Sequence, residues 1–244
     1  MQKIISIIPA RKGSKSILLK NIKKLLGKPL LVYSIEVALL LPSIKRVIVS
    51  TDSEEIAEIA KEYGAEVPFL RPRELAKDDT PDIPVFVHCL EWLKRNEEYV
   101  PDIIVHLRPT SPLRTVEMLK SGIELLIKNP EADSVRSVCV PHQTPYKMWL
   151  NENGFIVPLI KSESFNNVEM YNQPRQKLPK VYWQNASVDV VRYSTIMEKH
   201  SMTGERIVPL VMEERDSIDI DSDIDFIKAE AIMRTLGNKE KING

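Results

Sequence analysis

The chain has 244 residues, and its 34 lysine and arginine residues are matched by 34 aspartate and glutamate residues. Because this balance leaves no global electrostatic field, neither nucleic acid nor an anionic membrane is expected as a main partner. Two separated cysteines, Cys89 and Cys139, form no CxxC pair, which argues against a zinc site and a disulfide scaffold and favours a reducing cytoplasm.

Short apolar runs rich in Ile and Val recur between amphipathic stretches. The predicted strands cover residues 4–8, 47–49, 67–70, 103–107, 134–138, 188–191 and 207–211. The predicted helices cover residues 30–40, 53–63, 81–96, 115–127 and 222–236, with Ser53 as the expected N-cap of the second. This alternation predicts a three-layer αβα protein of the α/β class with a mostly parallel, doubly wound sheet. Such sheets bind ligands beyond the carboxyl ends of their strands.

The alternation stops between residues 141 and 183, where Pro, Asn, Gln and aromatic residues replace it. We interpret residues 1–244 as a single domain and residues 141–183 as an irregular excursion inserted into it. Long irregular segments in compact domains usually serve a function, so substrate capture or subunit contact is expected here. No apolar run reaches the length of a signal-peptide core or a membrane span, which predicts a cytosolic protein.

The first predicted strand leads into the segment PARKGSKSILLKN, residues 9–21. The first 31 residues contain eight lysine or arginine residues and no acidic residue. A loop with one glycine, a hydroxyl and several cations at the end of a strand is suited to a polyphosphate. The spacing fits neither a Walker loop nor GxGxxG, and a solvated basic loop is the alternative.

A second motif, SIDIDSD, covers residues 217–223 and precedes the last predicted helix. Alternation with period two places Asp219 and Asp221 on one face of an extended segment, where two carboxylates could share one Mg²⁺ ion. Ser222 and Asp225 have the spacing of a capping box at the start of the helix. A solvated acidic turn is the alternative interpretation.

The third motif, RPTSPLR, covers residues 108–114 and directly follows the strand predicted at residues 103–107. It brings hydroxyl and guanidinium donors to the same edge of the sheet. A Pro-rich turn that starts a helix with Thr115 as N-cap is the alternative. A cationic loop and a carboxylate pair together supply what phosphoryl chemistry with Mg²⁺ requires.

Four motifs in order carry a family resemblance: ARKGSKSILLKN, RPTSPLR, NQPRQKLPKVYWQNAS and SIDIDSDIDF. Over residues 4–236 the chain resembles the acylneuraminate cytidylyltransferase (CMP-sialic acid synthetase) family, and most closely its bacterial branch that activates legionaminic acid. The resemblance implies a nucleotide-diphospho-sugar transferase-like fold and a homodimer joined through residues 141–183. It also implies an enzyme that transfers CMP from CTP to the anomeric 2-hydroxyl of a nonulosonic keto-sugar acid, with Mg²⁺, and releases pyrophosphate.

The resemblance also implies roles for individual residues. Nucleotide binding is expected of residues in three loops, namely Arg11, Gly13, Ser14, Lys15, Lys20, Asn21, Arg71, Arg108, Thr110 and Ser111. Catalytic roles are expected of Arg11, Lys15, Asp219 and Asp221, the two aspartates as Mg²⁺ ligands. Binding of the acidic sugar is expected of Arg175, Gln176 and Asn185.

Four departures from the family pattern leave alternatives open. Ser16 replaces a usual Gly, Leu18 a Pro, Ala186 a Gly, and Arg108 a Gln. Because these changes alter turn geometry and charge, three alternatives stay open. They are a KDO-type cytidylyltransferase, a nucleotidylyltransferase that uses GTP or sugar 1-phosphates, and a non-catalytic nucleotide-binding protein. The sequence does not distinguish among nonulosonic acids, since pocket shape reads their stereochemistry.

Overall fold

The computed structural model describes residues 2–13, 17–166 and 168–243, with side chains through residue 236. The chain divides into two compact units. The larger comprises Met1–Val138 and Gln184–Gly244, and the smaller comprises Cys139–Trp183. All of the stretches predicted as strands and helices lie in the larger unit.

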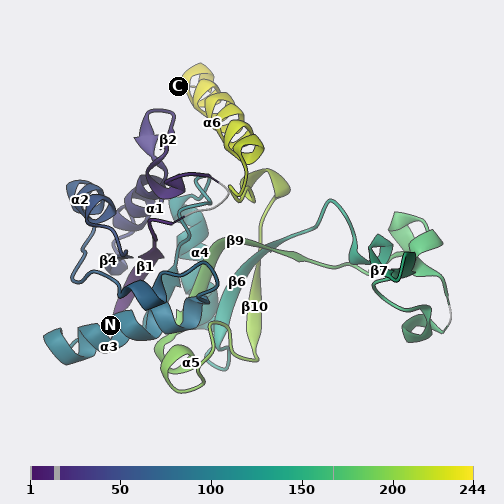
Figure 1. Cartoon of the computed structure of the whole chain (residues 1–244), viewed down its shortest axis with the longest axis horizontal. Coiled ribbons are helices and arrows are strands. Elements are labelled where there is room, and N and C mark those ends of the chain that lie inside the picture. Colours follow the sequence, from purple (N-terminus) through teal and green to yellow (C-terminus); the bar gives the residue numbers. More distant parts are fainter. Residues whose placement is uncertain (1, 14–16, 167, 244) are drawn as a thin grey trace. The chain divides into compact units, whose positions relative to one another are not determined.

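A six-stranded mixed sheet forms the centre of the larger unit (Figure 1). Its strands, in spatial order, are β10 (Ile207–Val211), β6 (Ser134–Cys139), β9 (Trp183–Arg192), β5 (Ile103–His106), β1 (Ile4–Pro9) and β4 (Ile44–Ser50). β1 pairs in parallel with both β4 and β5, and β10 pairs in parallel with β6. The predicted α/β class with a mostly parallel sheet is confirmed.

Helices cover both faces of this sheet. One face carries α1 (Leu30–Leu39), α2 (Glu54–Glu62) and α4 (Val116–Lys128), and the other carries α3 (Asp82–Glu97) and α5 (Tyr193–Met197). Strand β1 serves both layers because its side chains alternate: Ile4 and Ile8 pack into the first cluster, Ile5 and Ile7 into the second. Each such fully buried side chain contributes about 1.5–3 kcal/mol. The continuous apolar run of β1 is therefore explained by burial on two faces.

Predicted caps fix where several helices begin. Ser53 accepts a hydrogen bond from the Ile56 amide at the start of α2, and Thr115 accepts one from the Met118 amide at the start of α4. At the start of α6 (Asp223–Asn243), the Asp225 carboxylate accepts a hydrogen bond from the Ser222 amide. The Ser222 hydroxyl accepts one from the Asp225 amide in return. Such caps satisfy backbone donors that a helix leaves unpaired.

Two strand predictions require correction. Residues 67–70 form no continuous strand; only the isolated bridges Ile48–Glu66 and Thr51–Leu70 connect this stretch to the sheet. Pro68 has no amide hydrogen to give to a ladder, which explains the gap. The apolar run at 188–191 is part of β9, which pairs antiparallel with β5. A parallel neighbour needs a crossover connection, usually a helix, and the chain before β9 contains only short 3-10 turns and a hairpin.

The smaller unit has its own secondary structure and little core. Strands β7 (Trp149–Glu152) and β8 (Phe155–Pro158) form an antiparallel hairpin whose turn residues have positive φ angles. The ring of Trp149 lies 4.8 Å from that of Tyr171. Phe155 is 78% exposed. The predicted role of this unit in dimerisation and substrate capping stays a prediction.

A third apolar cluster joins the two ends of the chain within the larger unit. Ile17 and Leu25, from the N-terminal turn and the β2 (Lys24–Leu25) and β3 (Lys28–Pro29) hairpin, pack with Ile220 and with Phe226 of α6. This packing brings the N-terminal turn beside the acidic segment, although they are about 200 residues apart in the chain. In the described part of the chain, no helix has both the length and the apolar character needed to cross a membrane.

Candidate active site

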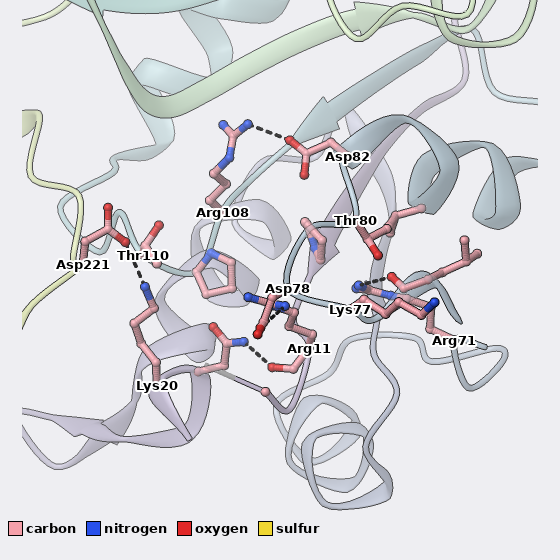
Figure 2. A pocket seen from close by; sticks show the side chains of 16 residues that line it. Arg11, Lys20, Arg71, Lys77, Asp78, Thr80, Asp82, Arg108, Thr110 and Asp221 are labelled. Carbon is pink, nitrogen blue, oxygen red and sulfur yellow. Dashed lines mark hydrogen bonds and ion pairs between the residues drawn. The ribbon is translucent and has the colours of Figure 1, made fainter. Parts of the chain in front are cut away.

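A cavity of about 480 Å³ opens in the larger unit beyond the ends of β1, β4 and β5. Its wall comes from four places in the chain: the N-terminal turn, the stretch between β4 and the start of α3, the loop after β5, and Asp221 in the segment before the last helix. Residues of this wall are shown in Figure 2. This is the position at which a doubly wound sheet is expected to bind a ligand.

Two hydrogen bonds to the backbone of the N-terminal turn fix its position beside the cavity. Asn21 donates from its amide to the Arg11 carbonyl oxygen at 2.8 Å, and the Lys12 amide donates to Asp52 at 2.8 Å. Arg11, Gly13, Lys20 and Asn21 all line the cavity. Ser14 and Lys15, two of the predicted phosphate ligands, and the departure at Ser16 lie outside the described residues.

The predicted cationic and acidic motifs meet in this cavity. The Lys20 ammonium donates to the Ile220 carbonyl oxygen at 2.8 Å and to the Asp221 carboxylate at 3.0 Å. The Ile220 amide in turn donates to the Thr110 carbonyl oxygen at 2.9 Å, which connects the loop after β5 to the same point. Figure 2 shows Lys20, Asp221 and Thr110 side by side. The three motifs therefore form one site.

Asp219 is the carboxylate whose surroundings favour a cation. Its Oδ1 atom is buried and has no hydrogen-bond partner among the described residues. Burial raises the pKa of Asp219 above its usual value, a hydrogen bond from Thr110 opposes the shift, and the neighbouring Asp221 adds to it. A buried carboxylate oxygen without a donor is costly unless a cation satisfies it.

This donor set fits Mg²⁺. The described residues contain no cluster of three or more His, Cys, Asp or Glu side chains that could hold a metal ion. Of the two predicted ligands, Asp221 lines the cavity, whereas Asp219 is not among the lining residues. Mg²⁺ is usually held by one or two carboxylates together with phosphate oxygens of a substrate and water. Hard oxygen ligands of this number are therefore suited to a metal that arrives with a nucleotide.

Two arginines of the cavity lining, Arg11 and Arg71, have different surroundings. Arg11 pairs with Asp78 at 2.7 Å, and both side chains are partly exposed. Arg71 is buried and donates to the Ser50 hydroxyl at 3.1 Å and to the Ser50 carbonyl oxygen at the end of β4. Burial lowers the pKa of Arg71 to about 10. It remains a cation at neutral pH.

Arg108, the first residue of the RPTSPLR loop, also lines the cavity. Its guanidinium donates to Asp82 at 2.8 Å and to Asp189 at 3.3 Å. Thr110 lines the cavity as well, whereas Ser111 is 1% exposed and donates to the Ala186 carbonyl oxygen. A direct contact between Ser111 and a nucleotide stays a prediction.

Of the three residues predicted to bind the sugar acid, Asn185 belongs to the larger unit but is not among the cavity-lining residues. Asn185 is fully buried: its amide donates to the Ser217 hydroxyl at 2.8 Å, and its carbonyl accepts from Ser137 at 2.6 Å. In this structure it holds β9 to β6 and to the segment that precedes Asp219. Arg175 and Gln176 belong to the smaller unit, where Arg175 donates to the Pro141 carbonyl oxygen at 2.8 Å. Substrate contact by these three residues stays a prediction.

Ala186 has a φ angle of 57°, in the left-handed region that favours glycine. The glycine that the resemblance led us to expect here would adopt this conformation without strain. The methyl group of Ala186 costs about 1 kcal/mol in this conformation. The replacement of the expected glycine by Ala186 therefore strains the backbone at this position.

Sequence reasoning missed the acidic and basic residues of the stretch that leads into α3. These cavity-lining residues are Lys77, Asp78, Thr80 and Asp82. The available signal was their position: Arg71 follows a predicted strand, so the residues after it reach the same edge of the sheet.

A doubly wound α/β sheet with a cationic turn and a carboxylate pair meeting beyond its strand ends defines a nucleotidyltransferase-like protein. The family model described as "Cytidylyltransferase" matches residues 5–242. The chain therefore belongs to the cytidylyltransferase family, and it is an enzyme of the nucleotidyltransferase class.

Named relatives agree with this assignment. The chain is 33% identical over 232 residues to the CMP-N,N'-diacetyllegionaminic acid synthase of Legionella pneumophila, an alignment that covers 95% of this chain and 96% of the relative. It is 31% identical over 243 residues to the N-acylneuraminate cytidylyltransferase of Escherichia coli, which covers 99% of this chain and 54% of that protein. Among solved structures, a CMP:2-keto-3-deoxy-manno-octonic acid synthetase complexed with CTP superposes with a TM-score of 0.70. It shares 14% identity, over 96% of this chain and 99% of that chain, and so supports the fold alone.

Proposed function

We propose that this enzyme transfers CMP from CTP to the anomeric 2-hydroxyl of a nonulosonic acid of the sialic or legionaminic type and releases pyrophosphate. The observation that carries the proposal is the contact between Lys20 of the N-terminal turn and Asp221 of the acidic pair, at 3.0 Å in one cavity. The relatives named for CMP-legionaminic and N-acylneuraminate synthesis support the choice of acceptor. The carboxylate pair supports transfer chemistry over simple nucleotide binding.

The side chains of the cavity divide the reaction between them. Arg11 and Lys20 hold the phosphates of CTP and stabilise the negative charge that develops on the departing pyrophosphate. Arg71, anchored on the end of β4, fixes the nucleoside end through its buried guanidinium. Binding both reactants in one cavity orients the sugar hydroxyl for in-line attack on the α-phosphorus.

Asp219 and Asp221 are the residues that hold Mg²⁺ in this proposal. When bound, the metal supplies positive charge to the phosphates and increases the acidity of the attacking hydroxyl. The unpaired, buried Oδ1 atom of Asp219 supports this assignment.

The direct test is a pyrophosphate-release assay. CTP and GTP are each combined with N-acetylneuraminic, legionaminic, pseudaminic and 3-deoxy-manno-octulosonic acid. The proposal predicts release with CTP and at least one nine-carbon acid. Release only with the eight-carbon acid, only with GTP, or with none despite measurable CTP binding would replace it with one of the alternatives.

A variant pair connects the assay to the cavity. Lys20→Met is expected to lower kcat/KM by roughly 100-fold, because it removes a phosphate-binding cation from the site. Lys24→Met is the matched control, since Lys24 is an exposed lysine of the same N-terminal region and does not line the cavity. Equal activity of the two variants would contradict the assigned role of Lys20.

We further propose that the smaller unit joins two copies of the chain and brings Arg175 and Gln176 to the partner's sugar site. Its exposed apolar side chains support this, among them Phe155 at 78% and Ile156 at 66% exposure. Mixing inactive Arg175→Ala and Asp219→Asn variants tests it. If sites are completed in trans, an equimolar mixture regains about a quarter of the wild-type activity, because about half of the dimers are mixed and one of the two sites in each is intact. No recovery after proven subunit exchange would reject shared sites.

A further inference from the structure

Two carboxylates with very different surroundings hold Arg108. Asp189 is 2% exposed and accepts from Nη1 of Arg108 at 3.3 Å. The Asp82 side chain is 38% exposed and accepts from Nη2 at 2.8 Å. One partner is therefore fixed inside the protein, and the other lies in the cavity wall in contact with solvent.

The buried partner is itself firmly anchored. Arg136 of β6 donates to both oxygens of Asp189, from Nε at 3.0 Å and from Nη2 at 3.2 Å. Asp189 lies on β9 directly opposite His106 of β5, so its backbone is fixed by the sheet. A buried carboxylate between two guanidinium groups cannot leave without exposing unpaired charge. Asp189 and Arg136 therefore hold Arg108 in one position.

The surroundings of Arg108 carry surplus positive charge. Arg114 is 6% exposed and donates to three neutral oxygens: the Ser187 carbonyl, the Ser34 hydroxyl and the Arg108 carbonyl. Burial, and then the nearby Arg108, lowers the pKa of Arg114 to about 9, so it remains charged at neutral pH.

Among the described residues, no protonated histidine adds to this charge, and the carboxylates that act on Arg108 or Arg114 are those of Asp82, Asp189 and Asp219. Burial lowers the pKa of His106 well below its ordinary value, so that residue is neutral. Within the described structure, three arginines thus adjoin one fully buried carboxylate, Asp189. Asp219, which also acts electrostatically on Arg114, is assigned to the metal. The partly exposed Asp82 supplies the remaining negative charge.

We propose that Arg108 binds the carboxylate of the acidic sugar, which takes the place of Asp82. This inference rests on the proposed function and assigns the group that recognises the acid. A partly exposed carboxylate on an anchored arginine is exchangeable, because a ligand carboxylate can accept the same hydrogen bond from Nη2 without losing charge balance.

The position of Arg108 favours the sugar over the nucleotide. In Figure 2 its guanidinium points toward Asp82 and away from the Lys20–Asp221 pair. Thr110, two residues further along the loop, hydrogen-bonds the Asp219 side chain. In a 2-keto acid the carboxylate and the anomeric hydroxyl are on adjacent carbons. A carboxylate on Arg108 therefore leaves the hydroxyl on the side of the acidic pair.

The sharpest test compares the sugar acid with its methyl ester, which lacks the charge. Both are measured as ligands of the full-length protein in the presence of CTP, by competition in the pyrophosphate assay, for wild type and Arg108→Gln. Wild type is expected to prefer the acid by roughly 10- to 100-fold, and Arg108→Gln by less than about 3-fold. The KM for CTP is expected to stay within about 2-fold. Arg73→Gln, an exposed arginine outside the cavity lining, is the matched control and keeps the wild-type preference.

A second variant gives an effect of opposite sign. Asp82→Asn removes the competing carboxylate, so the KM for the acid is expected to fall by roughly 3-fold or more while the KM for the ester stays unchanged. A merely structural ion pair would instead leave both constants unchanged or raise them. This variant also decides the matter if Arg108→Gln fails to fold.

Two results would overturn the proposal. One is an unchanged preference for the acid in Arg108→Gln. The other is a rise in the KM for CTP in that variant without a rise in the KM for the acid. A wild-type enzyme that is inactive with every acid would refute the proposed function itself, which is a different result.

Discussion

Two groups of carboxylates in the larger unit form ion pairs, and they differ in burial. Asp189 and Asp133 are 2% and 7% exposed and each has several partners, whereas Asp78, at 40% side-chain exposure, meets Arg11 at the cavity wall. Exposed pairs contribute about 0–1 kcal/mol, while a buried carboxylate that loses a partner costs several. The buried carboxylates therefore fix the frame of the site. The carboxylates of the cavity wall can instead be displaced from their arginines by the carboxylates of a ligand.

The largest expected effect comes from the carboxylate that belongs to neither group, because the Oδ1 atom of Asp219 is buried and has no hydrogen-bond partner among the described residues. Asp219→Asn is expected to lower kcat by about 1,000-fold in the pyrophosphate assay, since it removes a ligand of the metal. Asp223→Asn, an exposed aspartate paired with Lys23, is the control and keeps most of the activity. More than a tenth of wild-type turnover in Asp219→Asn would show that Asp219 is not a metal ligand.

Asn185 tests the contribution of buried polar contacts to the frame of the site. Asn185→Ala leaves the hydroxyls of Ser137 and Ser217 without their partner and is expected to lower the free energy of unfolding by about 1–3 kcal/mol. Urea denaturation measures this. Unchanged stability combined with a tenfold higher KM for the acid would instead support direct contact with the sugar.

Asp133 tests the same frame through pH. It accepts from Lys199 at 2.6 Å and from the amides of Glu205 and Arg206 at 2.9 and 3.1 Å. These contacts lower the pKa of Asp133 to about 2, with the hydrogen bond from Lys199 as the largest cause. Because this folded value is below the unfolded value, the contribution is present above about pH 4 and is lost as pH falls toward 2.

The variant Asp133→Asn is expected to be less stable than wild type by about 1 kcal/mol at pH 7, and the difference should shrink at pH 3. Denaturant titrations at both pH values measure it. A difference that is constant with pH would contradict an ionic contribution.

The smallest expected effect is at the cavity wall. Asp78→Asn removes the carboxylate that pairs with Arg11 and is expected to tighten tripolyphosphate binding by roughly two- to fivefold. Isothermal calorimetry at low salt measures it. Weaker binding in the variant would mean that Asp78 helps to bind the phosphates and does not compete with them.

Local signals predicted the frame of the sheet well. Apolar runs such as that of β1, and cap residues such as Ser53 and Thr115, report interactions within a few residues or burial on both faces. The meeting of Lys20 with Asp221 could also be anticipated, because loops that follow parallel strands gather at one edge of the sheet.

Features that depend on contacts between residues distant in the chain could not be predicted from the sequence in the same way. The direction of β9 depends on how the chain returns from residues 139–183, and no period in an apolar run encodes it. In the sequence, Asp189 is one polar residue within an apolar strand. Only the folded structure shows that β6 and the loop after β5 bring Arg136 and Arg108 to it. The burial of Asn185 likewise depends on partners about 30 and 50 residues away in sequence.

The account depends on the N-terminal cations and the acidic pair acting on one nucleotide and one ion. The most direct measurement is calorimetric titration of CTP with and without Mg²⁺, for wild type and for Asp219→Asn. We predict that Mg²⁺ tightens CTP binding to wild type by roughly 10-fold or more, and by less than about 2-fold in the variant, where binding through Arg11 and Lys20 remains. An equal effect of Mg²⁺ on both proteins would show that the acidic pair and the nucleotide do not share a site.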